Sequence, residues 1–164
     1  MHSDAFEVIG GHRLKGDLQP QGAKNEALQI LCVPILSTED VTIHNIPNIS
    51  DVNKLMELLK GLGVTIKHIS EGSYIFNAKN IDTDYLDSKE FRDNAKRIRG
   101  SVMLIGPLLA RFGRAFLPQP GGDKIGRRRL DTHFLAFEKL GAEFKFNEEK
   151  NQYTVETKIG RAHV

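Results

Sequence analysis

A pattern that occurs twice along the chain constrains the fold more than any other feature. Residues 58–67 and residues 137–145 each read as the end of an apolar helix, a Leu-Gly pair and a strand, with a second strand after it. Recurrence of a helix-and-strand unit predicts stacked copies, each needing a neighbour to cover its hydrophobic faces. Glycine is enriched at helix ends, so from these residues alone a common helix stop remains the alternative.

Periodicity and turn residues predict the other elements. Pro34 predicts a kink or early end in the first helix, and Ser50-Asp51 predicts a capped start for the second. Two short extended pieces close to a hairpin are expected at residues 8–11 and 14–19, and a loop with a short turn at 82–90. We expect helices over residues 26–36, 50–62, 93–112 and 131–141, and strands over 41–46, 64–69, 73–78, 114–119, 143–146 and 153–157.

Charge and cysteine content narrow the class of protein. Lys and Arg total 23 against 21 Asp and Glu, a formal charge of +2, which gives no overall attraction to nucleic acid or an anionic membrane. No apolar run approaches the roughly 20 residues that span a bilayer, and residues 1–6 lack a signal-peptide pattern. The single cysteine, Cys32, excludes an internal disulfide and suits a reducing compartment. We expect a cytoplasmic protein without nucleic-acid or membrane partners.

Two segments concentrate groups that bind anions. Gly-Ala-Lys-Asn at residues 22–25 places a cation and an amide at a predicted helix start, where unpaired N–H groups favour phosphate or carboxylate. For an isolated case a surface lysine is the commoner explanation. Residues 121–129 join three glycines and the carboxyl group of Asp123 to four cations. A solvated basic face or a nucleic-acid patch is the alternative, but no aromatic residues are interleaved for base stacking.

A third basic segment, Lys-Arg-Ile-Arg-Gly-Ser at residues 96–101, opens the predicted helix 93–112. Cations at a helix start oppose the helix dipole, so an anionic ligand explains them better than local stability. His133 could bind a ligand, although a histidine held by local hydrogen bonds at a helix start is the commoner case. The scattered histidines show no metal-ligand set. The residues alone therefore predict binding of a small anionic, phosphorylated molecule.

Several motifs together resemble the enolpyruvyl transferase family that acts on UDP-N-acetylglucosamine. They follow in order and at family spacing from about residue 6 to about residue 146. They are Gly-Ala-Lys-Asn-Glu-Ala-Leu at residues 22–28, Ile-Pro with Asp-Val at 46–52, Arg-Gly-Ser at 99–101, Gly-Pro-Leu-Leu-Ala-Arg-Phe-Gly at 106–113 and Pro-Gly-Gly-Asp-Lys-Ile-Gly at 120–126.

The resemblance implies an α/β (α+β) fold, an inverse α/β barrel of repeated βαβαββ units, here incomplete with about two units of one domain. It implies that residues 1–20 are strands of the other, missing domain and that residues 21–158 are a partial transferase domain. Residues 159–164 resemble a translated sequencing adapter and are expected to be a non-native tail. The missing C-terminal part would supply the catalytic base, so we expect the chain alone to be inactive and to expose apolar surface.

The implied reaction transfers the enolpyruvyl group of phosphoenolpyruvate to the 3-hydroxyl of UDP-N-acetylglucosamine and releases phosphate, the first committed step of peptidoglycan synthesis. No metal or organic cofactor is implied. Lys24 would contact phosphoenolpyruvate, and Asn25 would form a hydrogen bond with the sugar near its reacting hydroxyl. The implied catalytic residues are Asp123 and Lys24, and the implied substrate-binding residues are Lys24, Asn25, Arg99, Arg128, Arg129, Leu130, Asp131, Thr132 and His133.

Asp123 stands where the family usually has a cysteine that donates a proton. A carboxyl group is a general acid only while protonated, so a reference pKa of about 3.9 would have to rise. Neighbouring cations oppose that rise, whereas burial under a closed loop and anionic substrates favour it. Because a carboxylate is a much poorer nucleophile than a thiolate, we expect resistance to the epoxide fosfomycin.

Other departures leave alternatives open. Arg129 and Leu130 replace a common Pro-Val pair, which affects the nucleotide contacts. The sister transferase acting on shikimate phosphate carries a Lys-Ser pair where Lys24 is followed by Asn25. A fragment that binds a UDP-sugar without catalysis is the non-enzymatic alternative.

Overall fold

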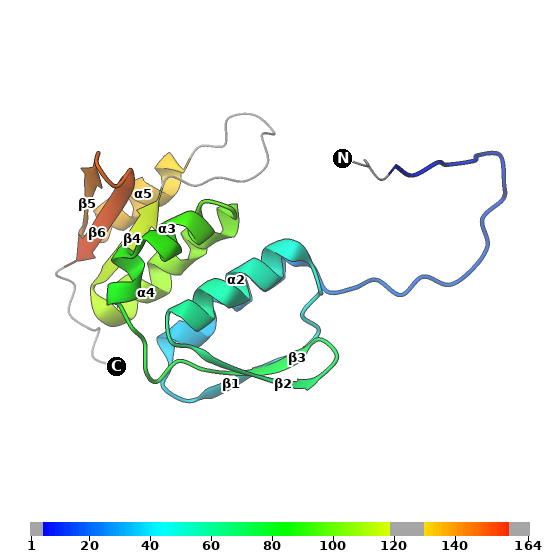
Figure 1. Cartoon of the computed structure of the whole chain (residues 1–164), viewed down its shortest axis with the longest axis horizontal. Helices are drawn as coiled ribbons and strands as arrows, with labels where there is room; N and C mark the ends of the chain where they lie inside the picture. The colour runs from blue at the N-terminus through cyan, green and yellow to red at the C-terminus, as the bar shows by residue number, and fades with distance from the viewer. Residues whose placement is uncertain (1–4, 119–129, 158–164) are drawn as a thin grey trace.

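The computed structural model describes residues 5–118 and 130–157. It contains helices packed with two small antiparallel sheets (Figure 1). The helices are α1 (Lys24–Ile30), α2 (Ser50–Gly61), α3 (Lys89–Ala95), α4 (Ile105–Phe112) and α5 (Asp131–Lys139), with 3₁₀ helices η1 (Val33–Leu36), η2 (Asp84–Asp87) and η3 (Arg99–Leu104). The strands are β1 (Asp40–Ile43), β2 (Thr65–Ser70), β3 (Ser73–Asn77), β4 (Arg114–Pro118), β5 (Ala142–Asn147) and β6 (Gln152–Thr157).

The repeat inferred from the Leu-Gly junctions is confirmed. The three-stranded sheets have the orders β1-β3-β2 and β4-β6-β5, so a helix follows the first strand of each and a hairpin closes each. At the two junctions Gly63 and Gly141 adopt φ values of 92° and 90°. Their amides donate to the carbonyls of Lys60 and Glu138, each over 2.9 Å. Glycine is required at both positions because this left-handed conformation strains residues that carry a Cβ.

The two copies do not close a barrel. Within the described residues each copy runs helix, strand, helix, strand, strand, from α1 to β3 and from α4 to β6. In residues 5–118 and 130–157, neither copy includes the leading strand of the expected βαβαββ unit. Figure 1 shows α3 and α4 lying between α2 and the second sheet. The chain therefore forms part of the expected architecture.

Helix α2 forms as its apolar spacing predicts. Val52, Leu55 and Leu59 are fully buried in the core shared with the first sheet. Burying each side chain of this size stabilises the fold by about 1.5–3 kcal/mol before entropy is counted. The expected side-chain cap at Ser50 is wrong. Ile49 occupies the N-cap position and its carbonyl accepts from the amide of Asn53, so Ser50 is already helical.

The long helix predicted over residues 93–112 is wrong, because the chain breaks into α3, η3 and α4. Ile98 is extended, and the buried hydroxyl of Ser101 donates to the carbonyls of Ala95 (3.0 Å) and Ile98 (2.9 Å). A serine that satisfies nearby carbonyls offers the backbone an alternative to a continuous helix. Lys96 and Arg97 consequently follow the C-terminal end of α3, where the helix dipole favours cations, and the argument that they oppose a dipole fails for them.

The predicted helix 26–36 is α1 followed by η1, with Pro34 near the start of the 3₁₀ helix, as the kink predicts. The hairpin expected at residues 8–19 is wrong. Residues 5–22 form no strand and extend away from the two sheets (Figure 1). A strand needs a partner edge for its backbone groups. The exposed apolar side chains of residues 5–22 are Phe6, Val8, Ile9, Leu14 and Leu18.

Arg111 ties three segments together from the end of α4. Its Nη1 donates to the carbonyls of Ile35 (2.8 Å), Ser37 (3.1 Å) and Ala78 (2.7 Å). These acceptors lie in and after η1 and directly after β3. The guanidinium therefore joins the second helix–strand copy to one end of the first sheet, where the start of β1 pairs with the end of β3.

Candidate functional site

The cation at the start of α1 is held by a carboxylate from α2. Lys24 is the first residue of α1, and its Nζ lies 3.1 Å from Oδ2 of Asp51. Asp51 sits in the first turn of α2, where the helix dipole favours a negative charge. The side chains are 41% and 37% exposed, so the pair adds little to stability. The pair does hold the ammonium group of Lys24 at the edge of the first copy, and this group keeps further N–H donors for a ligand.

Gly22 explains the backbone path into this site. A Cβ at this position would collide with the backbone carbonyl oxygen of Asn45. The sequence suggested that the glycine lets a ligand approach, but the structure shows the loop between β1 and α2 occupying that space. Gly22 therefore sets the position of Lys24 by close backbone packing.

A second predicted substrate residue lies on a segment that packs on α1. Arg99 is the first residue of η3 and is half-buried. A Cβ at the adjacent Gly100 would lie 3.2 Å from the side chain of Leu28. The structure thus brings the segments carrying Lys24 and Arg99 into contact. Asn25 is exposed on α1.

The remaining predicted residues belong to the start of α5 or lie outside the described residues. Leu130 is the N-cap residue of α5 and packs against the core. Asp131, Thr132 and His133 are exposed in the first turn. Among the described residues, no hydrogen bond or ion pair joins Thr132 or His133 to Lys24 or Asn25. Asp123, Arg128 and Arg129 lie outside the described residues.

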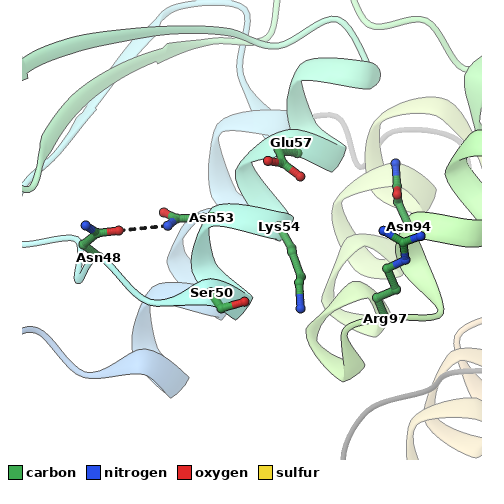
Figure 2. Close-up of a pocket in the computed structure, with 7 residues that line it drawn as sticks. All are labelled: Asn48, Ser50, Asn53, Lys54, Glu57, Asn94 and Arg97. Carbon is green, nitrogen blue, oxygen red and sulfur yellow. Dashed lines mark hydrogen bonds between the residues drawn. The ribbon is translucent and has the colours of Figure 1, made fainter. Parts of the chain in front are cut away.

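A polar groove lies along α2 (Figure 2). Its volume is about 460 Å³. It is lined by Asn48, Ser50, Asn53, Lys54, Glu57, Asn94 and Arg97. Arg97 belongs to a basic segment that is recognisable in the sequence, whereas Lys54 could not be predicted, because a lysine on the polar face of a helix carries no signal of its own.

A larger hollow of about 610 Å³ lies where the N-terminal segment meets the first sheet. Its lining includes Gln19, Gly22, Asn45 and the rings of His68 and Tyr74. The two rings meet edge to face with centroids 5.1 Å apart. No motif in the sequence predicted this hollow.

The chain's single cysteine cannot replace the cysteine expected in the loop. Cys32 is buried, and its Sγ donates to the carbonyl of Leu28 over 3.4 Å. Burial raises the pKa of the Cys32 thiol from 9.0 to about 12. The group therefore stays a thiol near neutral pH and is a poor nucleophile.

The described residues offer neither a metal site nor a helix that could span a membrane. No group of three or more His, Cys, Asp or Glu side chains in these residues could hold a metal ion. None of the helices in residues 5–118 and 130–157 has the length and apolar character required to cross a membrane.

Comparison with known proteins defines the family. Residues 8–164 match the family described as EPSP synthase (3-phosphoshikimate 1-carboxyvinyltransferase), and the chain belongs to that family. Within it, the chain is 54% identical over 151 residues to the UDP-N-acetylglucosamine 1-carboxyvinyltransferase of Bacteroides fragilis. It is 52% identical over 151 residues to the protein of the same name from Bacteroides thetaiotaomicron. Each match covers 92% of this chain but 35% of the relative, so the chain spans about a third of their length.

Solved structures support the fold. The enolpyruvyl transferase NikO from Streptomyces tendae matches 93% of this chain and 32% of its own with a TM-score of 0.70 and 21% identity. The EPSP synthase of Acinetobacter baumannii matches 87% of this chain with a TM-score of 0.57 and 13% identity. The partial α/β architecture is therefore that of enolpyruvyl transferases.

Proposed function

We propose that this chain is part of an enzyme that transfers the enolpyruvyl group of phosphoenolpyruvate to the 3-hydroxyl of UDP-N-acetylglucosamine and releases phosphate. The observation that carries the proposal is 54% identity over 92% of the chain to a relative of that name. The reaction belongs to peptidoglycan synthesis and takes place in the cytoplasm. Cell-wall formation, cell shape and cell division then depend on it.

In this proposal Lys24 binds the carboxylate or phosphate of phosphoenolpyruvate while Asp51 holds the ammonium in place. An ammonium has three donors, so the bond to Asp51 leaves others for substrate. Arg99 adds a second cation from the segment packed on α1, and Asn25 forms a hydrogen bond with the sugar. Charge-assisted hydrogen bonds of this kind are about twice as strong as neutral ones.

The loop and the start of α5 complete the proposed substrate site. Asp123 donates the proton as a general acid, and no thiol is present there for fosfomycin to alkylate. Arg128, Arg129 and Leu130 bind phosphate and nucleotide together with the first turn of α5. The residues proposed for that turn are Asp131, Thr132 and His133.

The chain alone is proposed to lack turnover because it spans 35% of its relatives. The rest of the parent protein would supply the catalytic base, and residues 1–20 would pack on that other domain. The exposed side chains of Phe6 and Leu14 support such packing, because apolar groups gain most free energy when water is excluded from them.

A shikimate-phosphate transferase is the second candidate, since the family's description names that reaction. Lys24 followed by Asn25 and the identity to UDP-sugar enzymes favour the first candidate. A non-catalytic fragment that binds UDP-sugar would keep the binding residues and lose the reaction.

The test is phosphate release by the full-length parent protein. Phosphoenolpyruvate is supplied with UDP-N-acetylglucosamine or with shikimate 3-phosphate, each with and without fosfomycin. We expect sustained turnover when phosphoenolpyruvate is supplied with UDP-N-acetylglucosamine, and none when it is supplied with shikimate 3-phosphate. We expect no inhibition by fosfomycin. Turnover with shikimate 3-phosphate would refute the substrate, and a covalent fosfomycin adduct on Asp123 would refute its proposed chemistry.

An Asp123→Cys variant separates a poor acid from a wrong family assignment. If the parent protein is inactive, recovery of turnover in this variant would locate the defect in the proton donor. We expect the variant to be active and to become sensitive to fosfomycin. Absence of turnover in both proteins would contradict the proposed reaction.

A further inference from the structure

The groove along α2 carries two cations on facing walls (Figure 2). Lys54 projects from α2, and Arg97 comes from the segment that follows α3. Within the described residues, neither side chain forms a hydrogen bond or an ion pair. Glu57 lines the same groove but forms no ion pair with either cation there. Two cations against one carboxylate leave the lining with a net positive charge, which favours an anion.

The N-terminal part of α2 and the neighbouring amides shape the rest of the groove. Ser50 places a hydroxyl in the first turn of α2, where backbone N–H groups add partial positive charge. The amide of Asn53 donates to Oδ1 of Asn48 over 2.8 Å, which orients both groups. This bond leaves the Nδ2 of Asn48 to donate and the Oδ1 of Asn53 to accept. Asn94 adds a further amide on the α3 side.

An apolar ligand or a protein hot spot does not fit this lining. All seven lining residues are polar or charged, whereas interface hot spots are enriched in aromatic anchors. A volume of about 460 Å³ lies within the range of small-molecule sites. The cations and the hydroxyl suit a phosphate, while the amides and Glu57 can bond to ligand hydroxyl groups.

We propose that this groove is a binding site for a small phosphorylated sugar. Lys54, Arg97 and Ser50 bind the phosphate, and Glu57 with the amides binds the hydroxyl groups. Ser50 precedes Asp51 in the chain, but the site uses none of the residues assigned to enolpyruvyl transfer. The inference therefore goes beyond the transfer reaction, and its test requires no turnover.

The experiment is an NMR titration of the complete 164-residue chain, labelled with ¹⁵N, with glucose 1-phosphate, inorganic phosphate and glucose as separate probes. We expect glucose 1-phosphate to shift the amide signals of Ser50, Asn53 and Asn94 and to bind at least about tenfold more tightly than either other probe. Equal affinity for inorganic phosphate would overturn the assignment to a sugar. Shifts confined to residues outside the groove would overturn the site itself.

Charge-neutralising variants test the two cations. Lys54→Gln and Arg97→Gln should each weaken binding of glucose 1-phosphate by about tenfold or more, equivalent to about 1.4 kcal/mol. The matched control is Lys60→Gln, an exposed lysine on the same helix outside the groove, which should change affinity less than twofold. Equal weakening by all three variants would indicate attraction to net charge and refute the site. Far-UV circular dichroism and melting curves confirm that each variant is folded.

Discussion

Arg111 offers the sharpest test of how the two copies are held together. Arg111→Ala would remove one nitrogen that donates to the carbonyls of Ile35, Ser37 and Ala78. Ile35 and Ala78 are fully buried, so their carbonyls have little access to replacement water. A buried acceptor left without a donor costs about 1–3 kcal/mol. The three carbonyls together would cost about 3–9 kcal/mol. Water can reach part of the space vacated by this half-buried side chain and lowers that cost, so we expect a net loss of about 3–5 kcal/mol.

The assay is urea unfolding of the complete chain, followed by circular dichroism. A loss of this size is a large share of the roughly 5–15 kcal/mol by which typical domains are stable. Arg114→Ala is the matched control, since Arg114 donates to the side chains of Thr83 (2.6 Å) and Asp84 (2.7 Å). The carboxylate of Asp84 is 90% exposed, so the control should lose no more than about 1 kcal/mol. Equal losses in the two variants, or less than about 1 kcal/mol for Arg111→Ala, would refute this reasoning.

Three further predictions concern the thiol and the candidate site. The raised pKa of Cys32, about 12 against 9.0 when exposed, should make folded protein unreactive toward thiol reagents near neutral pH. Above pH 9 the thiol ionises in the unfolded chain before it does in the folded one, so the free energy of unfolding should fall by roughly 1.4 kcal/mol per pH unit toward pH 12. In Cys32→Ala this contribution to the pH dependence of stability should be absent. Asp51→Asn should change the free energy of unfolding by less than about 1 kcal/mol. In the parent protein it should raise the KM for phosphoenolpyruvate, because Lys24 is no longer held in place. An unchanged KM would contradict the positioning role of Asp51. Gly22→Ala should cost about 1–3 kcal/mol in urea unfolding, because its methyl group meets the carbonyl of Asn45, and a neutral result would refute the close packing.

Local sequence signals determined most of the repeat. The apolar spacing of α2, the alternating strands and the glycines at 63 and 141 depend on contacts a few residues apart, which is why they can be recognised without tertiary information. The repeated junction then predicted two similar units. The family resemblance added the partial barrel, which the helix and strand order alone did not define.

Side-chain hydrogen bonds and tertiary contacts decided the elements that the sequence predictions got wrong. The apolar run after residue 98 has helical spacing, but the hydroxyl of Ser101 and the packing of Gly100 on Leu28 divide it into separate helices. Residues 5–22 have strand-like composition, yet a strand forms only where another edge supplies hydrogen bonds. Composition cannot reveal whether that edge is present.

The sequence by itself determined the repeated unit and the types of residue available to bind an anion. Tertiary structure decided which of them meet. Lys24 reaches Asp51 across 27 positions of the chain, and Lys54 faces Arg97 because α2 packs against α3. Helical periodicity sets which side of a helix a side chain occupies, but the packing of one helix on another sets the charge that it faces. The pairing of Lys24 and the unpaired cations of the groove therefore follow from the fold.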